Sequence, residues 1–103
     1  MKRYKVSFRP AAEADLVALY DRIAAEAGPV VAGNYIDRIE VVCLSLDAFP
    51  LRGTKRDDIR PGLRTFGFER RATIAFHIDK TEVVIIRVFY GGRDYERILK
   101  RPE

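Results

Sequence analysis

The side chains best suited to chemistry in this sequence are arginines in its second half. Four of them lie on predicted strands or at strand ends, namely Arg64, Arg71, Arg87 and Arg93. A planar guanidinium binds carboxylates and phosphates through paired hydrogen bonds. The sequence places aromatic residues between these arginines: Phe66, Phe68, Phe89, Tyr90 and Tyr95. This mixture suits docking of an acidic partner, either a protein or a nucleic acid whose bases stack on aromatic rings, although core packing also accounts for most of the rings.

Candidates for catalysis are scarce. His77 is the single histidine, and such a residue on a strand is usually structural or solvated, although it could act as a base if a substrate met that face. Cys43 is the single cysteine and falls on the apolar stripe of a predicted helix, which favours a core position. The sequence shows no glycine-rich phosphate loop, metal-ligand spacing or serine elbow. We therefore predict no catalytic residue, no metal and no cofactor.

Arg87 interrupts an otherwise apolar strand, "VVIIRVFY". Strict alternation predicts that Val84, Ile86 and Val88 face the helices. Arg87 then lies on the other face, beside Ala75 or His77. Because burying an unpaired guanidinium would cost several kcal/mol, we predict that this second face is open and serves as a docking surface for another polypeptide.

The elements that must position these residues follow from periodicity and turn signals. We predict a strand over 2–8, a helix from Pro10 to about 27, a second helix over 29–48, a loop over 49–62, and strands over 63–68, 71–78 and 83–90. The tail beyond the last strand could add a turn of helix. Gly28 ends the first helix and Pro29 opens the second, so the two form a hairpin. The prediction is an α+β fold, β-α-α-β-β-β, with the αα-hairpin on one face of a small, mainly antiparallel four-stranded sheet.

Length and composition fit one soluble domain covering residues 1–103. The sequence shows neither an apolar run long enough for a membrane helix nor a signal peptide, and its lone cysteine suits the cytoplasm. The net charge is +4 but is unevenly spread: residues 10–48 hold seven acids and two bases, whereas 49–103 hold thirteen bases and eight acids. This asymmetry favours a partner with an acidic surface, although two solvated faces that cancel at a distance remain the alternative.

Three stretches carry a family resemblance. They are "KVSFRPAAEADLVALYDRIA", "AGNYIDRIEVVCLSLDAFPLRGTKRDDIRPGLRTF" and "VVIIRVFYGGRDYERIL". In order and spacing they resemble the ParE branch of the RelE/ParE toxin superfamily, the toxin half of bacterial type II toxin–antitoxin pairs, over nearly the whole chain. RelE-like members cleave messenger RNA with basic residues and a tyrosine or histidine near the C-terminus. Here Arg93 matches one basic position, whereas Thr73 and Leu99 replace an arginine and the terminal tyrosine.

The resemblance therefore implies a non-enzymatic toxin that inhibits DNA gyrase by binding it and is neutralised by a cognate ParD-like antitoxin of the ribbon-helix-helix type, in a hetero-oligomer. We expect antitoxin contacts at Leu16, Tyr20, Arg64, Arg71, Arg87 and Phe89. We expect target contacts at Arg93, Tyr95 and Arg97. The alternatives are a RelE-like endoribonuclease that uses Arg64, Arg93 and Tyr95 or His77, and a binding module that has kept the fold and lost toxicity.

Overall fold

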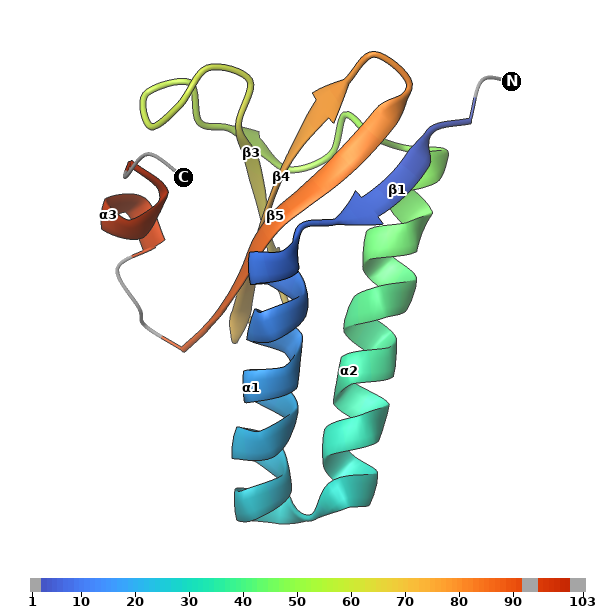
Figure 1. Ribbon diagram of the computed structural model, residues 1–103, viewed down its shortest axis with the longest axis vertical. Coiled ribbons are helices and arrows are strands. Elements are labelled where there is room, and N and C mark those ends of the chain that lie inside the picture. The colour runs from blue at the N-terminus through green and yellow to red at the C-terminus, as the bar shows by residue number, and fades with distance from the viewer. Residues whose placement is uncertain (1–2, 92–94, 101–103) are drawn as a thin grey trace.

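Within the residues that the computed structural model describes, 3–91 and 95–100, two antiparallel helices pack against one face of a five-stranded sheet (Figure 1). The elements in chain order are β1 (Lys5–Phe8), α1 (Pro10–Ala27), α2 (Pro29–Leu44), the 3-10 turn η1 (Ser45–Asp47), β2 (Thr54–Lys55), β3 (Arg64–Phe68), β4 (Ala72–Asp79), β5 (Glu82–Tyr90) and α3 (Tyr95–Leu99). The predicted α+β class and element order are confirmed, with β2 as an additional strand. The second helix ends four residues earlier than predicted and continues as η1.

The helical hairpin is set by three residues at its ends. Pro10 and Pro29 each occupy the first turn of a helix, where a missing N–H is tolerated. Gly28 joins the helices at φ +93°, and its N–H donates to the carbonyl of Ala24. A residue with a side chain is strained at that φ, so glycine allows the chain to reverse without a longer loop.

The sheet has the order β1-β5-β4-β3-β2, with β1 parallel to β5 and the remaining pairs antiparallel. The short strand β2 pairs Thr54 with Thr65 and Lys55 with Arg64. It was missed in the sequence because two exposed residues inside a loop rich in proline, glycine and charge carry no periodic signal. Gly53 lets β2 approach β3 closely, since a Cβ there would lie 2.3 Å from the carbonyl oxygen of Thr65.

The main core lies between the helices and the sheet. Tyr35 of α2 meets Phe68 and Tyr90 edge to face, with ring centroids 5.5 and 6.1 Å apart. The fully buried residues of this core come from both layers: Ala12, Ala32, Ile39, Cys43, Leu46, Ile74, Phe76, Val83 and Ile85. Burying these apolar faces against each other holds the two layers together.

A β-bulge changes which residues of β5 face the helices. Ala75 pairs with Arg87 while the next residue, Phe76, pairs with Ile85, so Ile86 is an extra residue in β5. Val83, Ile85 and Val88 consequently pack in the helix-facing core, whereas Ile86 and Phe89 belong to a cluster on the far face. The predicted helix-facing set of Val84, Ile86 and Val88 is therefore right only for Val88. Val84 alternates with the helix-facing Val83 and Ile85, and Ile86 lies on the far face, because a period of two does not continue through a bulge.

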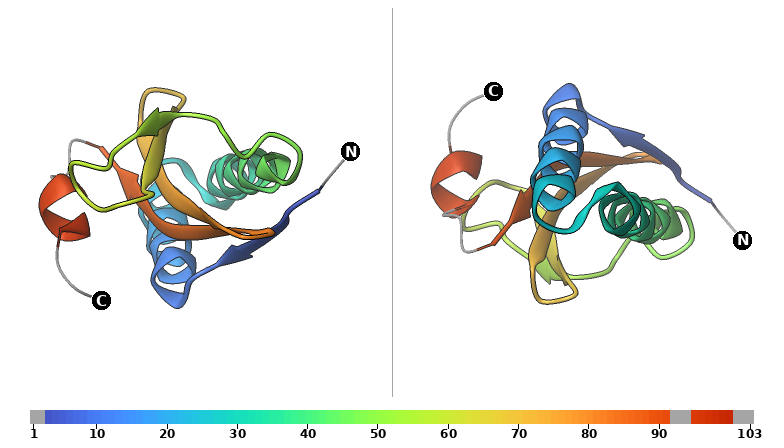
Figure 2. Two further views of the ribbon diagram at one scale, coloured as in Figure 1. Left: turned by 90° about the horizontal axis from the view of Figure 1, so that it is seen from above. Right: turned by 90° about the horizontal axis from the view of Figure 1, so that it is seen from below.

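The far face of the sheet is covered in part by the chain itself. We call this second cluster the far-face cluster; its buried members are Leu63, Ala75, Ile86, Phe89 and Leu99, with Ile59, Tyr95 and Ile98 packed against them. The helix α3 supplies Tyr95, Ile98 and Leu99, and it stands apart from the α1–α2 pair (Figure 2). The prediction of an open docking face is thus wrong for the part of the sheet around Ile86 and Phe89. The three apolar residues of α3 lie on one side of that helix and pack against this part of the sheet.

Candidate partner-binding site

Arg87 forms an internal ion pair that holds α1 to β5. Its Nε and Nη2 donate to the two carboxylate oxygens of Asp15 at 2.7 and 2.9 Å, and the backbone N–H of Val88 donates to the same carboxylate at 2.9 Å. The register of β1 with β5 stops at Phe8 and Ile85, so Asp15 supplies an acceptor to β5 just beyond the end of β1. The Asp15 hydrogen bond raises the pKa of Arg87. The sequence around Arg87 gives no sign of this partner. The pair with Asp15 makes Arg87 a structural residue rather than an exposed anchor.

The other two arginines predicted as antitoxin contacts lie elsewhere. Arg64 pairs with Phe76 and therefore points to the helix-facing side of the sheet, where its Nη1 donates to the carbonyl of Arg52 at 3.4 Å. Arg71 is exposed in the turn just before β4, and a hydrogen bond to the hydroxyl of Tyr90 raises the pKa of Arg71. The three arginines thus form no common surface.

The predicted residues near the C-terminus surround α3. The side chain of Phe89 is only 1% exposed and stacks at a tilt on Tyr95, with centroids 5.8 Å apart, so a partner could contact Phe89 only if α3 moved. The hydroxyl of Tyr95 accepts a hydrogen bond from Nη1 of Arg56 at 3.2 Å. Arg97 is exposed on α3, and Arg93 lies outside the described residues.

The described groups considered for RNA cleavage, Arg64, His77 and Tyr95, do not lie on one face of the sheet. Arg64 points to the helix side of the sheet, whereas His77 alternates with Phe76 and Ile78 of the helix-facing core and points to the far side. Tyr95 is held by Arg56. Cleavage requires a base and a cation at one scissile phosphate, and Arg64, His77 and Tyr95 are not arranged for that. Among the described residues, no cluster of histidine, cysteine and acidic side chains could hold a metal ion.

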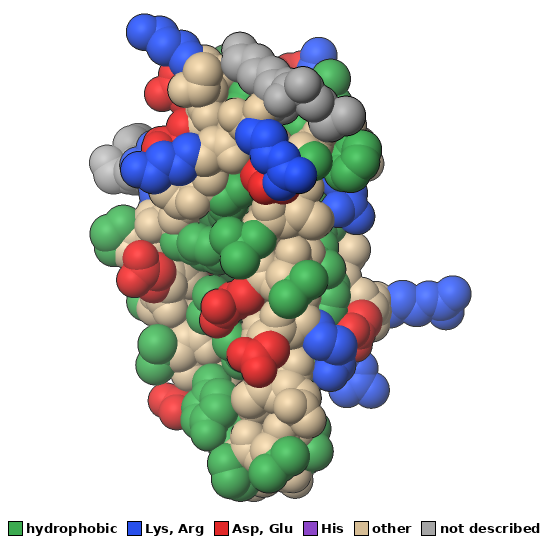
Figure 3. Space-filling model, turned by 90° about the vertical axis from the view of Figure 1, so that its right-hand side faces the viewer, with side chains coloured by type: hydrophobic (Ala, Val, Ile, Leu, Met, Phe, Trp, Pro, Cys, Tyr) green, Lys and Arg blue, Asp and Glu red, His purple; other side chains and the backbone are tan. Residues whose placement is uncertain are grey.

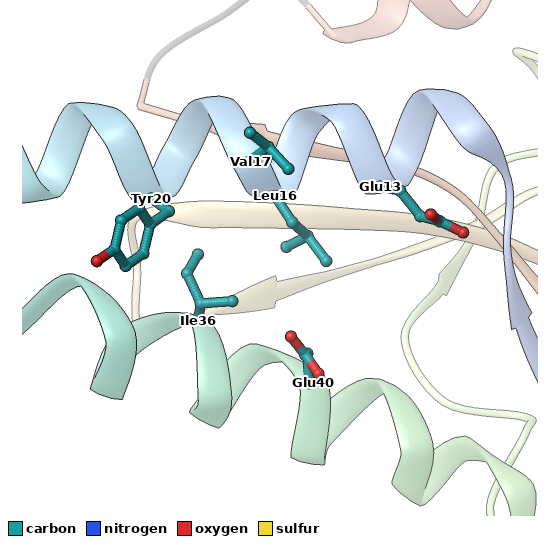
Figure 4. A pocket seen from close by; sticks show the side chains of 6 residues that line it. All are labelled: Glu13, Leu16, Val17, Tyr20, Ile36 and Glu40. Carbon is teal, nitrogen blue, oxygen red and sulfur yellow. The ribbon is translucent and has the colours of Figure 1, made fainter. Parts of the chain in front are cut away.

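Leu16 and Tyr20 lie together in an apolar groove between α1 and α2 (Figure 4). Val17 of α1 and Ile36 of α2 complete its apolar lining, and the volume is about 380 Å³. Glu13 and Glu40 line the end opposite Tyr20 (Figure 4). Val17 is 63% exposed and Tyr20 36% exposed, so the groove presents apolar surface to solvent. We call this feature the helix groove.

The helix groove belongs to a surface of mixed character. Figure 3 shows hydrophobic and acidic side chains side by side over the face of the molecule nearest α2, with lysines and arginines toward its upper and right-hand edges. Val17 and Ile36 were not predicted as site residues, and helical spacing from Leu16 and Tyr20 is the signal that could have found Val17. No helix among the described residues is both long and apolar enough to cross a membrane.

Comparison with known proteins places this arrangement in a family. Residues 6–95 match the model for the ParE toxin of the parDE type II toxin–antitoxin system. Toxin ParE3 of Caulobacter vibrioides is 36% identical over 77 residues, which cover 75% of this chain and 76% of that protein.

Solved structures agree on the fold. The chromosomal ParDE toxin–antitoxin system of P. aeruginosa contains a chain that superposes with a TM-score of 0.76 at 27% identity, covering 86% of this chain and 97% of that one. A chain of the RelBE2 toxin–antitoxin complex of Mycobacterium tuberculosis has a TM-score of 0.60 at 23% identity, covering 85% and 98%, and shows the shared fold alone. The sequence match over most of the chain and the common fold establish that this protein belongs to the ParE family of type II toxin–antitoxin toxins.

Proposed function

We propose that this ParE-family toxin inhibits DNA gyrase by binding it, without catalysing a reaction, and that a ParD-like antitoxin neutralises it. Family membership supports the choice of target. The dispersal of Arg64, His77 and Tyr95 over both faces of the sheet supports a binding mechanism over RNA cleavage. Because both proposed partners are cytoplasmic, we propose that the protein acts in the cytoplasm.

The helix groove is the observation that carries the proposal of an antitoxin site. It offers exposed apolar surface from Leu16, Val17 and Tyr20 of α1 beside Ile36 of α2, which fits the apolar face of an amphipathic helix. Because Glu13 and Glu40 line one end, the antitoxin segment there should carry a lysine or arginine. The antitoxin and toxin would then form a hetero-oligomer in which the groove is buried.

A matched pair of substitutions tests the groove. Val17→Asp introduces a charge into the groove, whereas Val30→Asp introduces the same charge at a position that is 74% exposed at the start of α2 and outside the groove lining. By calorimetry with the cognate antitoxin, Val17→Asp should weaken binding at least tenfold, which is about 1.4 kcal/mol, and Val30→Asp should leave it within twofold. Equal affinities for both variants would exclude the groove from the interface.

The target is tested by two assays run on the same purified protein. The toxin should block plasmid supercoiling by purified gyrase and leave RNA intact in a translation mixture. Adding an equimolar amount of antitoxin should restore supercoiling. Cleavage of RNA, with supercoiling unaffected, would overturn the proposal in favour of an endoribonuclease, and inactivity in both assays together with normal growth on expression would favour a non-toxic binding module.

A further inference from the structure

A second pocket lies where the tip of the helical hairpin meets the hairpin between β3 and β4. Its volume is about 490 Å³. It is distinct from the helix groove, because the two pockets share none of their lining residues. Its lining comes from α1, α2, the turn between β3 and β4, and the end of β5.

The pocket combines an apolar wall with a polar end. Ile23 and Ala27 of α1 and Val31 of α2 form the apolar side. At the polar end, Arg71 donates a hydrogen bond to the hydroxyl of Tyr90 rather than to a carboxylate of the described residues. This leaves the guanidinium with further N–H donors, since it carries five in all.

Tyr35 gives the pocket a buried hydroxyl that lacks a protein partner. Its side chain is 7% exposed, and no described residue hydrogen-bonds its hydroxyl. Burial raises the pKa of Tyr35, so the hydroxyl keeps its proton and can act as a donor. A buried polar group without a partner is unfavourable, and such groups need an explanation in the function or in a missing ligand.

The acidic residues of the pocket limit what can bind. Arg38 donates two hydrogen bonds to Glu69, at 2.8 and 3.0 Å, so that pair is internally neutral. Glu26 also lines the pocket and repels anions, so a phosphate carrying two negative charges would be disfavoured more strongly than a carboxylate carrying one. Of the two arginines that line the pocket, Arg38 is paired with Glu69, whereas Arg71 forms no ion pair within 4 Å among the described residues and can therefore bind a single carboxylate.

We propose that this pocket binds a glutamate side chain from an acidic segment of a partner protein. The carboxylate accepts hydrogen bonds from Arg71 and Tyr35, and the aliphatic stem lies against Ile23, Ala27 and Val31. The strongly basic second half of the chain favours approach of an acidic segment. This assignment does not depend on the helix groove or on which protein supplies the glutamate.

The test titrates the ¹⁵N-labelled protein with N-acetylglutamate amide and follows backbone NMR shifts. We expect shifts centred on residues 34–38, 69–72 and 90, and at least fivefold weaker binding of the uncharged N-acetylglutamine amide. Tyr35→Phe and Arg71→Gln should each weaken binding of the glutamate probe at least fivefold. Lys55→Gln, which removes an exposed charge on β2, should leave it unchanged.

Tyr35→Phe separates binding from folding. Because it removes a hydroxyl with no protein partner, its thermal midpoint should equal or exceed that of the parent protein, so weaker binding could not be attributed to unfolding. Shifts spread over all basic segments, equal binding of the glutamine probe, or unchanged binding by Tyr35→Phe would each overturn the proposal. Val17→Asp should bind the probe normally, so failure of the helix groove as an antitoxin site and failure of this pocket are distinguishable.

Discussion

Replacing Asp15 with alanine should be among the most destabilising single substitutions in this chain. The Asp15 carboxylate accepts hydrogen bonds from Nε and Nη2 of Arg87 and from the backbone N–H of Val88. The side chain of Asp15 is only 11% exposed and that of Arg87 only 23%. Removing one partner of a buried ion pair costs about 3–5 kcal/mol. Because Arg87 keeps some contact with water, we expect the lower end, about 3 kcal/mol, or roughly 15 °C in the midpoint of a domain this size.

The assay is urea unfolding followed by circular dichroism, with three comparisons. Asp21→Ala removes an exposed acid from the same helix and should change stability by less than about 0.5 kcal/mol. Asp15→Asn keeps one acceptor oxygen, so its free energy of unfolding should fall by less than that of Asp15→Ala. The double variant Asp15→Ala, Arg87→Met should recover part of the loss, because it no longer contains an unpaired buried charge. A loss below about 1 kcal/mol for Asp15→Ala would refute this account of the pair.

The same pair changes how an Arg87 variant must be interpreted. From the sequence alone, Arg87→Glu is expected to weaken antitoxin binding at least tenfold. In the structure, however, it would set two carboxylates against each other and remove the bond that holds α1 to β5. Lost affinity in this variant would therefore report damage to the fold, and only affinity measured on a variant shown to be folded can assign Arg87 to an interface.

Three further predictions follow from the packing. Gly53→Ala should destabilise the protein by about 2 kcal/mol or more, because a Cβ there would clash with the carbonyl of Thr65, whereas Gly62→Ala, at nearly the same φ but with open space around it, should cost less. Cys43 should not react with a thiol reagent at pH 8 until the protein unfolds, because burial raises the pKa of its thiol to about 12. Leu99→Ala should cost about 2 kcal/mol and increase binding of a hydrophobic dye, since it removes a buried side chain from the far-face cluster.

Local signals in the sequence were sufficient for the helices and the long strands. Pro10, Gly28 and Pro29 mark helix ends through their own backbone preferences, which act within a few residues. Helical spacing puts Leu16 and Tyr20, four residues apart, on one face of α1, and both line the helix groove. These features required no knowledge of contacts between distant segments.

The features that were missed depend on such distant contacts. Asp15 and Arg87 are 72 residues apart, and nothing in either local sequence indicates their pairing. The bulge at Ile86 arises from the register between β4 and β5, which alternation along one strand cannot reveal. The sequence of α3 contains three apolar residues, but their packing over Phe89 depends on where the helix lies against the assembled sheet.

The position of α3 also constrains how neutralisation can work. The helices α1 and α2 cover one face of the sheet and α3 lies on the other. The sheet therefore separates Leu16 and Tyr20, which we propose contact the antitoxin, from Tyr95 and Arg97, which we predict contact the target. Moreover, α3 is fixed to the preceding loop, because Arg60 donates to the carbonyl of Leu99 at 2.8 Å and Arg56 pairs with Glu96 at 3.1 Å. An antitoxin segment confined to the helix groove therefore cannot cover α3. Either the antitoxin extends around the molecule to reach α3, or gyrase contacts the helices as well, and an antitoxin fragment limited to its groove-binding helix would block gyrase inhibition only in the second case.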